Sequence, residues 1–149
     1  IMSTLGIRPG GGCHYLPEGY AAMARQLLPQ LNRYNYNIKT RKSVTPPNIT
    51  NIAFTTDAKD AIEVTFDQNV HWTDDVSQRF YFETQDSKVA EVTGTGNTIT
   101  LSLSNPTTAT TLSYIQGGKW RMDDAIIYGE NRLAALTFCE VQIRMAGSR

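Results

Sequence analysis

Hydrophobic and polar residues alternate one by one through much of the chain after residue 47, a pattern typical of half-buried β-strands. Turn-forming runs such as Asp57–Asp60 and Gly94–Asn97 separate the alternating segments. Strands are predicted at residues 52–54, 62–66, 80–82, 89–92, 99–103, 112–116 and 136–143. Short strands with frequent turns and no second strong helix predict an antiparallel β-sandwich of about seven strands.

A different period marks residues 17–33, where apolar residues recur at spacings of three and four and predict one amphipathic helix. Its apolar stripe consists of Tyr20, Met23, Ala24, Leu27, Leu28 and Leu31. Pro17 suits the first turn, where its missing N–H needs no partner. Pro29 removes a backbone donor, so the helix is expected to kink or end near Leu28. The stripe requires a partner surface on a sheet, the following domain or another chain.

The composition changes again between the helix and the first strand. Residues 37–47 are rich in Lys, Thr and Pro and end in Pro46-Pro47, which predicts a linker. The chain therefore divides into residues 1–36, a linker at 37–47 and a β-domain at 48–149. Lys39, Arg41 and Lys42 in the linker are interpreted as solvated residues, with attraction of an acidic sugar as the alternative.

Charge and hydropathy exclude two classes of partner. The 14 basic and 14 acidic residues cancel, and no block of like charge stands out. A nucleic-acid surface needs a concentrated positive field, so no nucleic-acid partner is predicted. No apolar run reaches the length that crosses a bilayer, so no membrane span is predicted either.

No residue pattern typical of a metal or cofactor site is present, and neither is predicted. The acidic residues Asp57, Asp60, Asp74, Asp75, Asp123 and Asp124 lack the spacing of a calcium loop and are interpreted as solvated turns, with calcium binding as the alternative. Cys13 and Cys139 lie at opposite ends of the chain and are taken as separate thiols, with a disulfide between them as the alternative. Trp72 and Trp120 are interpreted as caps on the β-core, with stacking on a sugar as the alternative.

The candidate catalytic residue is His14. It follows the three glycines Gly10-Gly11-Gly12, which leave room for a substrate to approach the backbone, and it precedes the helix that starts at Pro17. An imidazole in this position can exchange a proton near neutral pH. The alternative interpretation is a loop histidine whose ring bonds to a nearby backbone group.

The run GIRPGGGCHYLPEGYAAMARQLLPQL resembles the C-terminal end of the catalytic domain of SGNH-type hydrolases, in particular the bacterial relatives of sialate O-acetylesterases. The resemblance implies that His14 matches the catalytic base, and that Pro17, Gly19 and Tyr20 match the turn that opens the closing helix. Many members place an aspartate three residues before the histidine to orient its ring. This chain has Gly11 there, so any orienting group must come from elsewhere.

The nucleophile that the resemblance implies is missing from the sequence. The family carries its serine in a Gly-Asp-Ser turn, and no such turn occurs here; the chain also opens on Ile1. Both observations predict a C-terminal piece of a longer protein. Without an activated hydroxyl and an oxyanion hole, the chain alone is expected not to hydrolyse an ester.

The resemblance therefore implies a fold that is mainly β, with an antiparallel sandwich preceded by a loop and one helix left from an α/β hydrolase domain. It implies a serine-dependent carbohydrate O-acetylesterase, acting on an acetylated carbohydrate in an extracellular or periplasmic location. It also implies that the missing N-terminal part, or a second chain, packs on helix 17–33. The alternatives are a carbohydrate-binding module and a structural or assembly module, both without catalysis.

Overall fold

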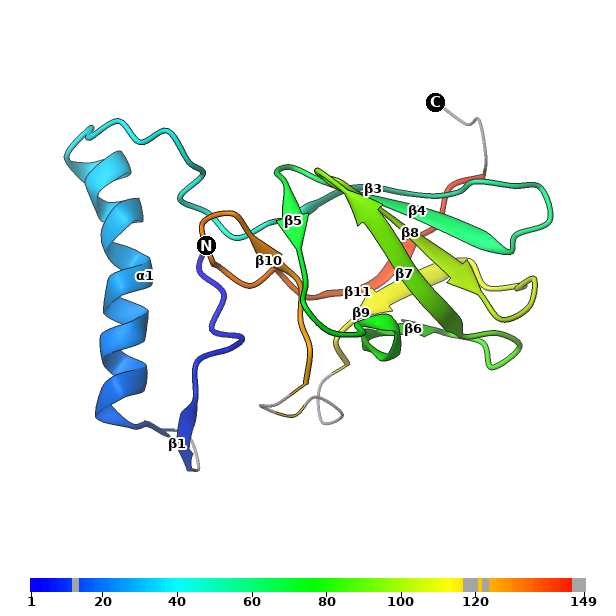
Figure 1. The fold of residues 1–149 in the computed structure, drawn as a ribbon, viewed down its shortest axis with the longest axis horizontal. Helices are drawn as coiled ribbons and strands as arrows, with labels where there is room; N and C mark the ends of the chain where they lie inside the picture. The colour runs from blue at the N-terminus through cyan, green and yellow to red at the C-terminus, as the bar shows by residue number, and fades with distance from the viewer. Residues whose placement is uncertain (12–13, 117–120, 122–123, 146–149) are drawn as a thin grey trace.

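The computed structural model describes residues 1–11, 14–116, 121 and 124–145. Its N-terminal part holds the short strands β1 (Pro9–Gly11) and β2 (His14–Tyr15) and the helix α1 (Pro17–Asn35). The strands and single 3-10 turn that follow are β3 (Ile49–Phe54), β4 (Ala61–Phe66), β5 (Val70–His71), η1 (Ser77–Arg79), β6 (Phe80–Phe82), β7 (Val89–Thr95), β8 (Thr98–Leu103), β9 (Thr111–Tyr114), β10 (Tyr128–Gly129) and β11 (Phe138–Gln142). The prediction of a mainly β chain with one helix is confirmed (Figure 1).

Two antiparallel sheets form the body of the β-domain. One has four strands in the order β3-β4-β8-β7, and the other has three in the order β11-β9-β6. They meet along one edge, where Ala53 of β3 bridges to Arg144 just after β11 and the Phe54 N–H donates to the Arg144 carbonyl. The short strands β5 and β10 pair with each other beside these sheets.

The strands predicted at residues 52–54 and 62–66 are confirmed and form a hairpin, in which Ile52 pairs with Val64 and Phe54 with Ile62 across β3 and β4. The predicted turn at Gly94–Asn97 begins later than expected. β7 continues to Thr95, which pairs with Thr98. Gly94 therefore lies inside the strand. A Cβ at this position would collide with the Thr98 carbonyl, so a residue with a side chain would disturb the strand pairing that glycine allows.

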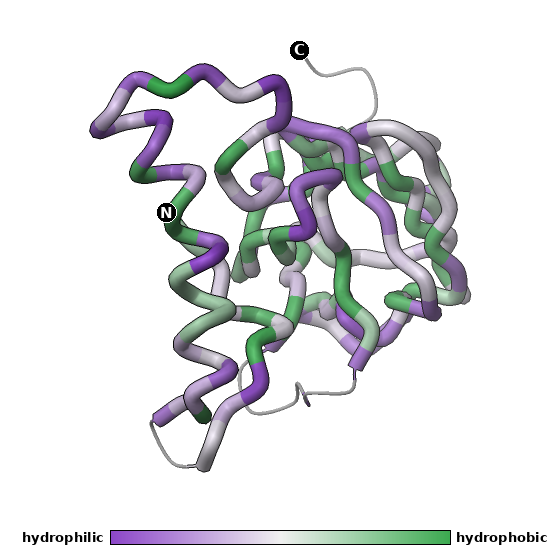
Figure 2. Tube along the Cα trace, turned by 60° about the vertical axis from the view of Figure 1, so that its left-hand side comes forward, coloured by the Kyte–Doolittle hydropathy of each residue, from purple (hydrophilic) through white to green (hydrophobic). Residues whose placement is uncertain are grey.

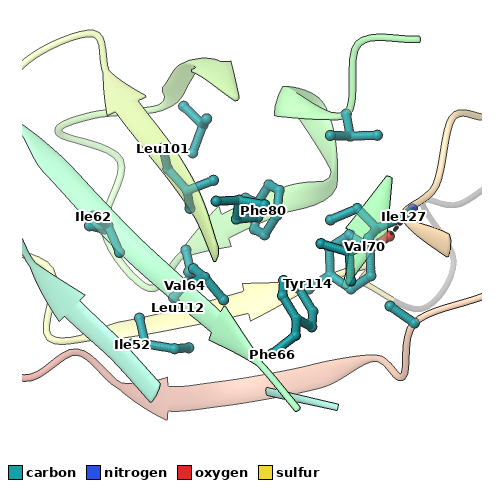
Figure 3. Close-up of a cluster of buried hydrophobic side chains, with 14 of the residues drawn as sticks. Ile52, Ile62, Val64, Phe66, Val70, Phe80, Leu101, Leu112, Tyr114 and Ile127 are labelled. Carbon is teal, nitrogen blue, oxygen red and sulfur yellow. Dashed lines mark hydrogen bonds between the residues drawn. The ribbon is translucent and has the colours of Figure 1, made fainter. Parts of the chain in front are cut away.

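One apolar core takes its residues from both main sheets (Figure 3). The alternation of β4 and β8 places Ile62, Val64, Ile99 and Leu101 in it with no exposed surface. From β9 and β6, the rings of Tyr114 and Phe80 pack against each other at a tilt, with their centroids 5.1 Å apart. Trp72 packs against this core half-buried, as its interpretation as a capping residue predicts, while Trp120 lies outside the described residues.

The acidic residues of the turns bond to donors of the chain itself. Asp75 accepts hydrogen bonds from the backbone N–H and the hydroxyl of Ser77, and Asp124 forms an ion pair of 2.9 Å with Arg79. Asp123 lies outside the described residues. In the part of the chain that the structure describes, no three His, Cys, Asp or Glu side chains gather as a metal site.

Two carboxylates hold the loop before β9 against the segment after β6. Glu83 accepts from the backbone and hydroxyl groups of Thr110 and Thr111, and Asp86 accepts from both groups of Thr108. Burial would raise the pKa of Glu83, but these hydrogen bonds together outweigh it and lower the pKa from 4.5 to about 2. The hydroxyls of Thr84 and Thr108 likewise hold the pKa of Asp86 well below its usual range.

Tyr114 gives the first test of this architecture. Its ring is fully buried, and its hydroxyl accepts a hydrogen bond of 2.8 Å from the Ile127 N–H (Figure 3). Tyr114→Phe leaves that N–H buried without a partner, so we expect it to lower the free energy of unfolding by about 1–3 kcal/mol in urea denaturation. Tyr34→Phe, at an exposed tyrosine, is the matched control and should change it by less than about 0.5 kcal/mol. Equal effects of the two substitutions would contradict the assignment.

Glu83 predicts a dependence of stability on pH. Its folded-state pKa lies below the unfolded value, so the ionised carboxylate stabilises the fold above about pH 4.5 and loses this effect as the pH falls towards 2. We expect the urea midpoint of the native chain to fall more steeply over this range than that of Glu83→Gln. The exposed Glu91, changed to Gln, should leave the slope as in the native chain. Parallel slopes for the native and Glu83→Gln chains would refute the role of the carboxylate.

Candidate functional site

His14 lies at the end of the loop that leads into α1. It forms β2 with Tyr15, and its backbone pairs with Gly11 of β1. The side chain of His14 is exposed. No ion pair, ring contact or side-chain hydrogen bond joins it to another residue in the described ranges. The imidazole is therefore accessible from solvent and is not sealed in a core.

The position that carries an aspartate in the resembled family is directly opposite His14. Gly11 has φ +117°, a conformation that side-chain-bearing residues rarely adopt, and a Cβ there would meet nothing within 4 Å. An aspartate at this position would have room for its side chain, but its backbone would have to adopt this unfavourable conformation. In the described structure, the space beside the imidazole is open to solvent or to another protein surface.

Gly19 fixes the approach of the helix to this loop. A Cβ at Gly19 would lie 2.9 Å from the Tyr15 Cβ and 3.0 Å from the Arg8 carbonyl oxygen, so the backbones come closer than any side chain would allow. The Tyr15 and Tyr20 rings then meet edge to face, 5.9 Å apart. The Pro-x-Gly-Tyr sequence after His14 thus sets where the helix begins relative to the imidazole.

The same N-terminal segment connects α1 to the β-domain. A Cβ at Gly6 would lie 2.9 Å from the Tyr128 hydroxyl of β10, which shows how closely this segment approaches the short β5–β10 pair. Ile7 is buried, with 4% of its surface exposed. Residues 6–8 therefore contact the helix on one side and the β-domain on the other (Figure 1).

The helix runs further than the sequence predicts. It continues to Asn35, so of the two effects expected of Pro29, a kink or an end near Leu28, the end is wrong. Pro29 and Arg25 are both exposed, so water can bond to the carbonyl that loses its intrahelical donor. In the segment predicted as a linker, residues 37–42 are exposed, whereas Val44, Pro46 and Pro47 are buried against the β-domain.

The predicted apolar stripe of α1 has no cover in the described structure. Between 40% and 55% of the surface is exposed at each of four residues, Tyr20, Leu27, Leu28 and Leu31. Figure 2 shows hydrophobic positions recurring along the helix between hydrophilic ones. Met23, which belongs to the same stripe by its spacing from Tyr20 and Leu27, is half-buried.

The side of α1 that is buried is partly polar. Gly19 and Gln30 are its two buried residues, and Gln26 is half-buried. The Gln26 Oε1 and Gln30 Nε2 atoms have no hydrogen-bond partner among the described residues. Burying unpaired amide atoms is unfavourable, and so is exposing a leucine stripe. Internal contacts therefore account poorly for the orientation of this helix.

The remaining candidates are placed as follows. Cys139 of β11 has a free, exposed thiol, and Cys13 lies outside the described residues. Lys39, Arg41 and Lys42 are exposed, as expected of a solvated connector. Across the described ranges, no helix is long and apolar enough to cross a bilayer.

A hollow on the outer face of the β11-β9-β6 sheet was missed by the sequence analysis. It has a volume of about 760 Å³, and β6, β9, β11 and the segment after β6 line it. Two non-glycine residues with left-handed backbones lie in its wall, Ile115 (φ +58°) and Glu140 (φ +51°). Period-two alternation marked these strands as half-buried, but it does not show which outer face is concave.

Comparison with known proteins identifies no family for the chain: no family model matches it, and no curated protein is significantly similar.

The uncovered stripe gives a test of what packs on α1. Replacing Leu27 and Leu31 together by Lys should change the urea midpoint of this chain little, because both side chains are already 40% exposed. In a longer protein whose N-terminal part covers the stripe, the same pair should cost several kcal/mol, about 2–5 for each leucine that becomes buried there. Arg25→Ala is the control in both proteins. A large loss of stability in this chain alone, or a dimer that the double substitution dissociates, would contradict cover by an N-terminal part.

Proposed function

We propose that this chain is the C-terminal part of a serine-dependent carbohydrate O-acetylesterase of the SGNH type. In this proposal His14 is the catalytic base, α1 is the closing helix of the hydrolase domain, and the two main sheets form an accessory antiparallel β-sandwich. The protein would act on acetylated carbohydrate outside the cytoplasm. The nucleophilic serine and the oxyanion hole would belong to the part that precedes residue 1.

The observation that carries the proposal is the pairing of an accessible imidazole with an uncovered apolar helix. His14 is exposed at the mouth of α1, and the leucine stripe of the same helix faces solvent. A preceding α/β domain that packed on the stripe would lie along the helix that begins three residues after His14. It could thereby bring a serine hydroxyl to His14 and cover both surfaces at once.

The proposed chemistry uses His14 twice. Its neutral imidazole takes the proton of the serine hydroxyl as that oxygen attacks the acetyl carbonyl, and the resulting imidazolium gives the proton to the departing sugar hydroxyl. The imidazole then takes a proton from water as the water oxygen attacks the acetyl-enzyme, and the imidazolium returns this proton to the serine oxygen as acetate is released. Gly11 supplies no orienting carboxylate, so the group that holds the ring must come from the covering domain.

The decisive experiment compares two histidines in the longer protein. With a chromogenic acetyl ester, His14→Ala should lower kcat about 10²- to 10⁴-fold, since a positioned base contributes rate of that order. His71→Ala is the matched control: it removes the other histidine of the chain, which is also exposed but lies in β5, and should leave the rate nearly unchanged. The chain of residues 1–149 should show no activity. Hydrolysis by this chain alone, or full activity of the His14→Ala protein, would refute the proposal.

A second function is favoured by a specific observation on the β-domain. The hollow on the outer face of the β11-β9-β6 sheet combines aromatic and hydrogen-bonding side chains, and does so far along the chain from His14. It is compatible with the carbohydrate-binding alternative and does not depend on catalysis.

A further inference from the structure

The outer face of the β11-β9-β6 sheet carries a row of side chains of three different kinds. Along β6, Phe80 is buried in the core, so its neighbour Tyr81 points to the opposite face of the sheet. Tyr81 pairs with Ser113 of β9, which likewise lies between the buried Leu112 and Tyr114. An aromatic ring and a hydroxyl therefore stand side by side on the outer face, at the floor of the 760 Å³ hollow.

A β-bulge adds a carboxylate to this row. Phe138 pairs with Tyr114 and Val141 with Leu112, so two residues of β11, Cys139 and Glu140, stand opposite Ser113. The Glu140 N–H donates to the Ser113 hydroxyl oxygen at 2.8 Å, which fixes the bulge. Bulges redirect side chains, and Glu140 consequently lines the hollow with its side chain exposed.

The backbone around the hollow is held in unusual conformations. Ile115 has φ +58°, which is rare for a β-branched residue, and its N–H donates to the Arg79 carbonyl at 2.8 Å. Glu140 is left-handed as well. On the other rim, Glu83 is fixed by its bonds to Thr110 and Thr111. The walls are thus set before any ligand arrives, and strained positions of this kind cluster at binding sites.

The chemistry of the lining favours one class of ligand. We propose that this hollow is a binding site for a neutral oligosaccharide, which stacks a sugar ring on Tyr81 and bonds its hydroxyls to Glu140, Gln85 and Gln116. A tyrosine face suits the apolar side of a sugar ring, and carboxylates and amides accept and donate to hydroxyls. The site goes beyond the proposed esterase role and does not require it.

Charge and shape argue against other ligands. The described lining residues include one cation, Lys88, and two carboxylates, Glu83 and Glu140, so an anionic sugar or phosphate is disfavoured. A peptide that adds a strand needs an exposed sheet edge, whereas this hollow lies on a sheet face and offers side chains. A hydroxyl-rich neutral ligand satisfies these groups without bringing a charge.

The test uses the chain of residues 1–149 on a glycan array that holds neutral and sialylated oligosaccharides, followed by calorimetric titration of the strongest neutral ligand. Tyr81→Ala should weaken binding about tenfold or more, since the stacking surface is lost. Tyr81→Phe keeps the ring and should bind within about threefold of the native chain. Tyr36→Ala removes an exposed aromatic residue at the end of α1 and should have no effect.

Glu140→Gln and Gln85→Ala test the site without the risk of misfolding that Tyr81→Ala carries. Both residues are exposed, and their substitution should leave the circular dichroism spectrum unchanged. Each should weaken binding by about two- to tenfold, as expected for loss of one hydrogen bond. The proposal is overturned if no neutral oligosaccharide is retained, if sialylated glycans alone are retained, or if Tyr81→Ala, Glu140→Gln and Gln85→Ala all bind as the native chain does. Binding needs no catalysis, so an inactive longer protein would end the esterase proposal and leave this one standing.

Discussion

The structure depends on one apolar core that two narrow sheets share. Neither the four-stranded nor the three-stranded sheet can bury its inner face alone, so each supplies the surface that the other needs. Tyr114 stands in this core, between the rings of Phe80 and Phe138. Its hydroxyl also accepts a hydrogen bond from the Ile127 N–H, which attaches the segment before β10 to the core. β10 in turn meets the N-terminal segment at Gly6, so this segment is in contact with a strand next to the same core.

The N-terminal unit contrasts with this satisfied core. Its helix touches the rest of the chain through Gly19 and two glutamines with unpaired amide atoms, and it presents its leucines to solvent. Hydrophobic burial is the main favourable term in folding, so a helix in this state has its largest source of stability still to gain. A surface that covered the stripe would also decide what stands next to His14. The surroundings of the imidazole and the cover of the stripe therefore depend on the same neighbouring surface.

The two candidate sites lie on different units and differ in whether the chain itself supplies all the groups of the site. His14 is held by a short two-strand loop and can act only with groups that another surface supplies. The hollow beside Tyr81 is built from the β-domain itself, with hydrogen bonds and a bulge that fix its walls. An enzyme domain that acts on carbohydrate and a β-domain that holds carbohydrate would increase the local concentration of substrate at the first site. The role proposed for each unit does not require the role proposed for the other.

The sequence by itself determined the local elements: the strands of the two main sheets, the start of the helix at Pro17, the apolar stripe and the exposed loop of His14. These depend on periodicity and turn chemistry, which act between neighbours in the chain. Tertiary structure alone decided the pairing of β5 with β10, the burial of Pro46 and Pro47, the continuation of α1 past Pro29, and the bulge that turns Glu140 into the hollow. Those features arise from contacts between segments far apart in sequence, and alternation gives neither the strand register nor the side of the helix that docks.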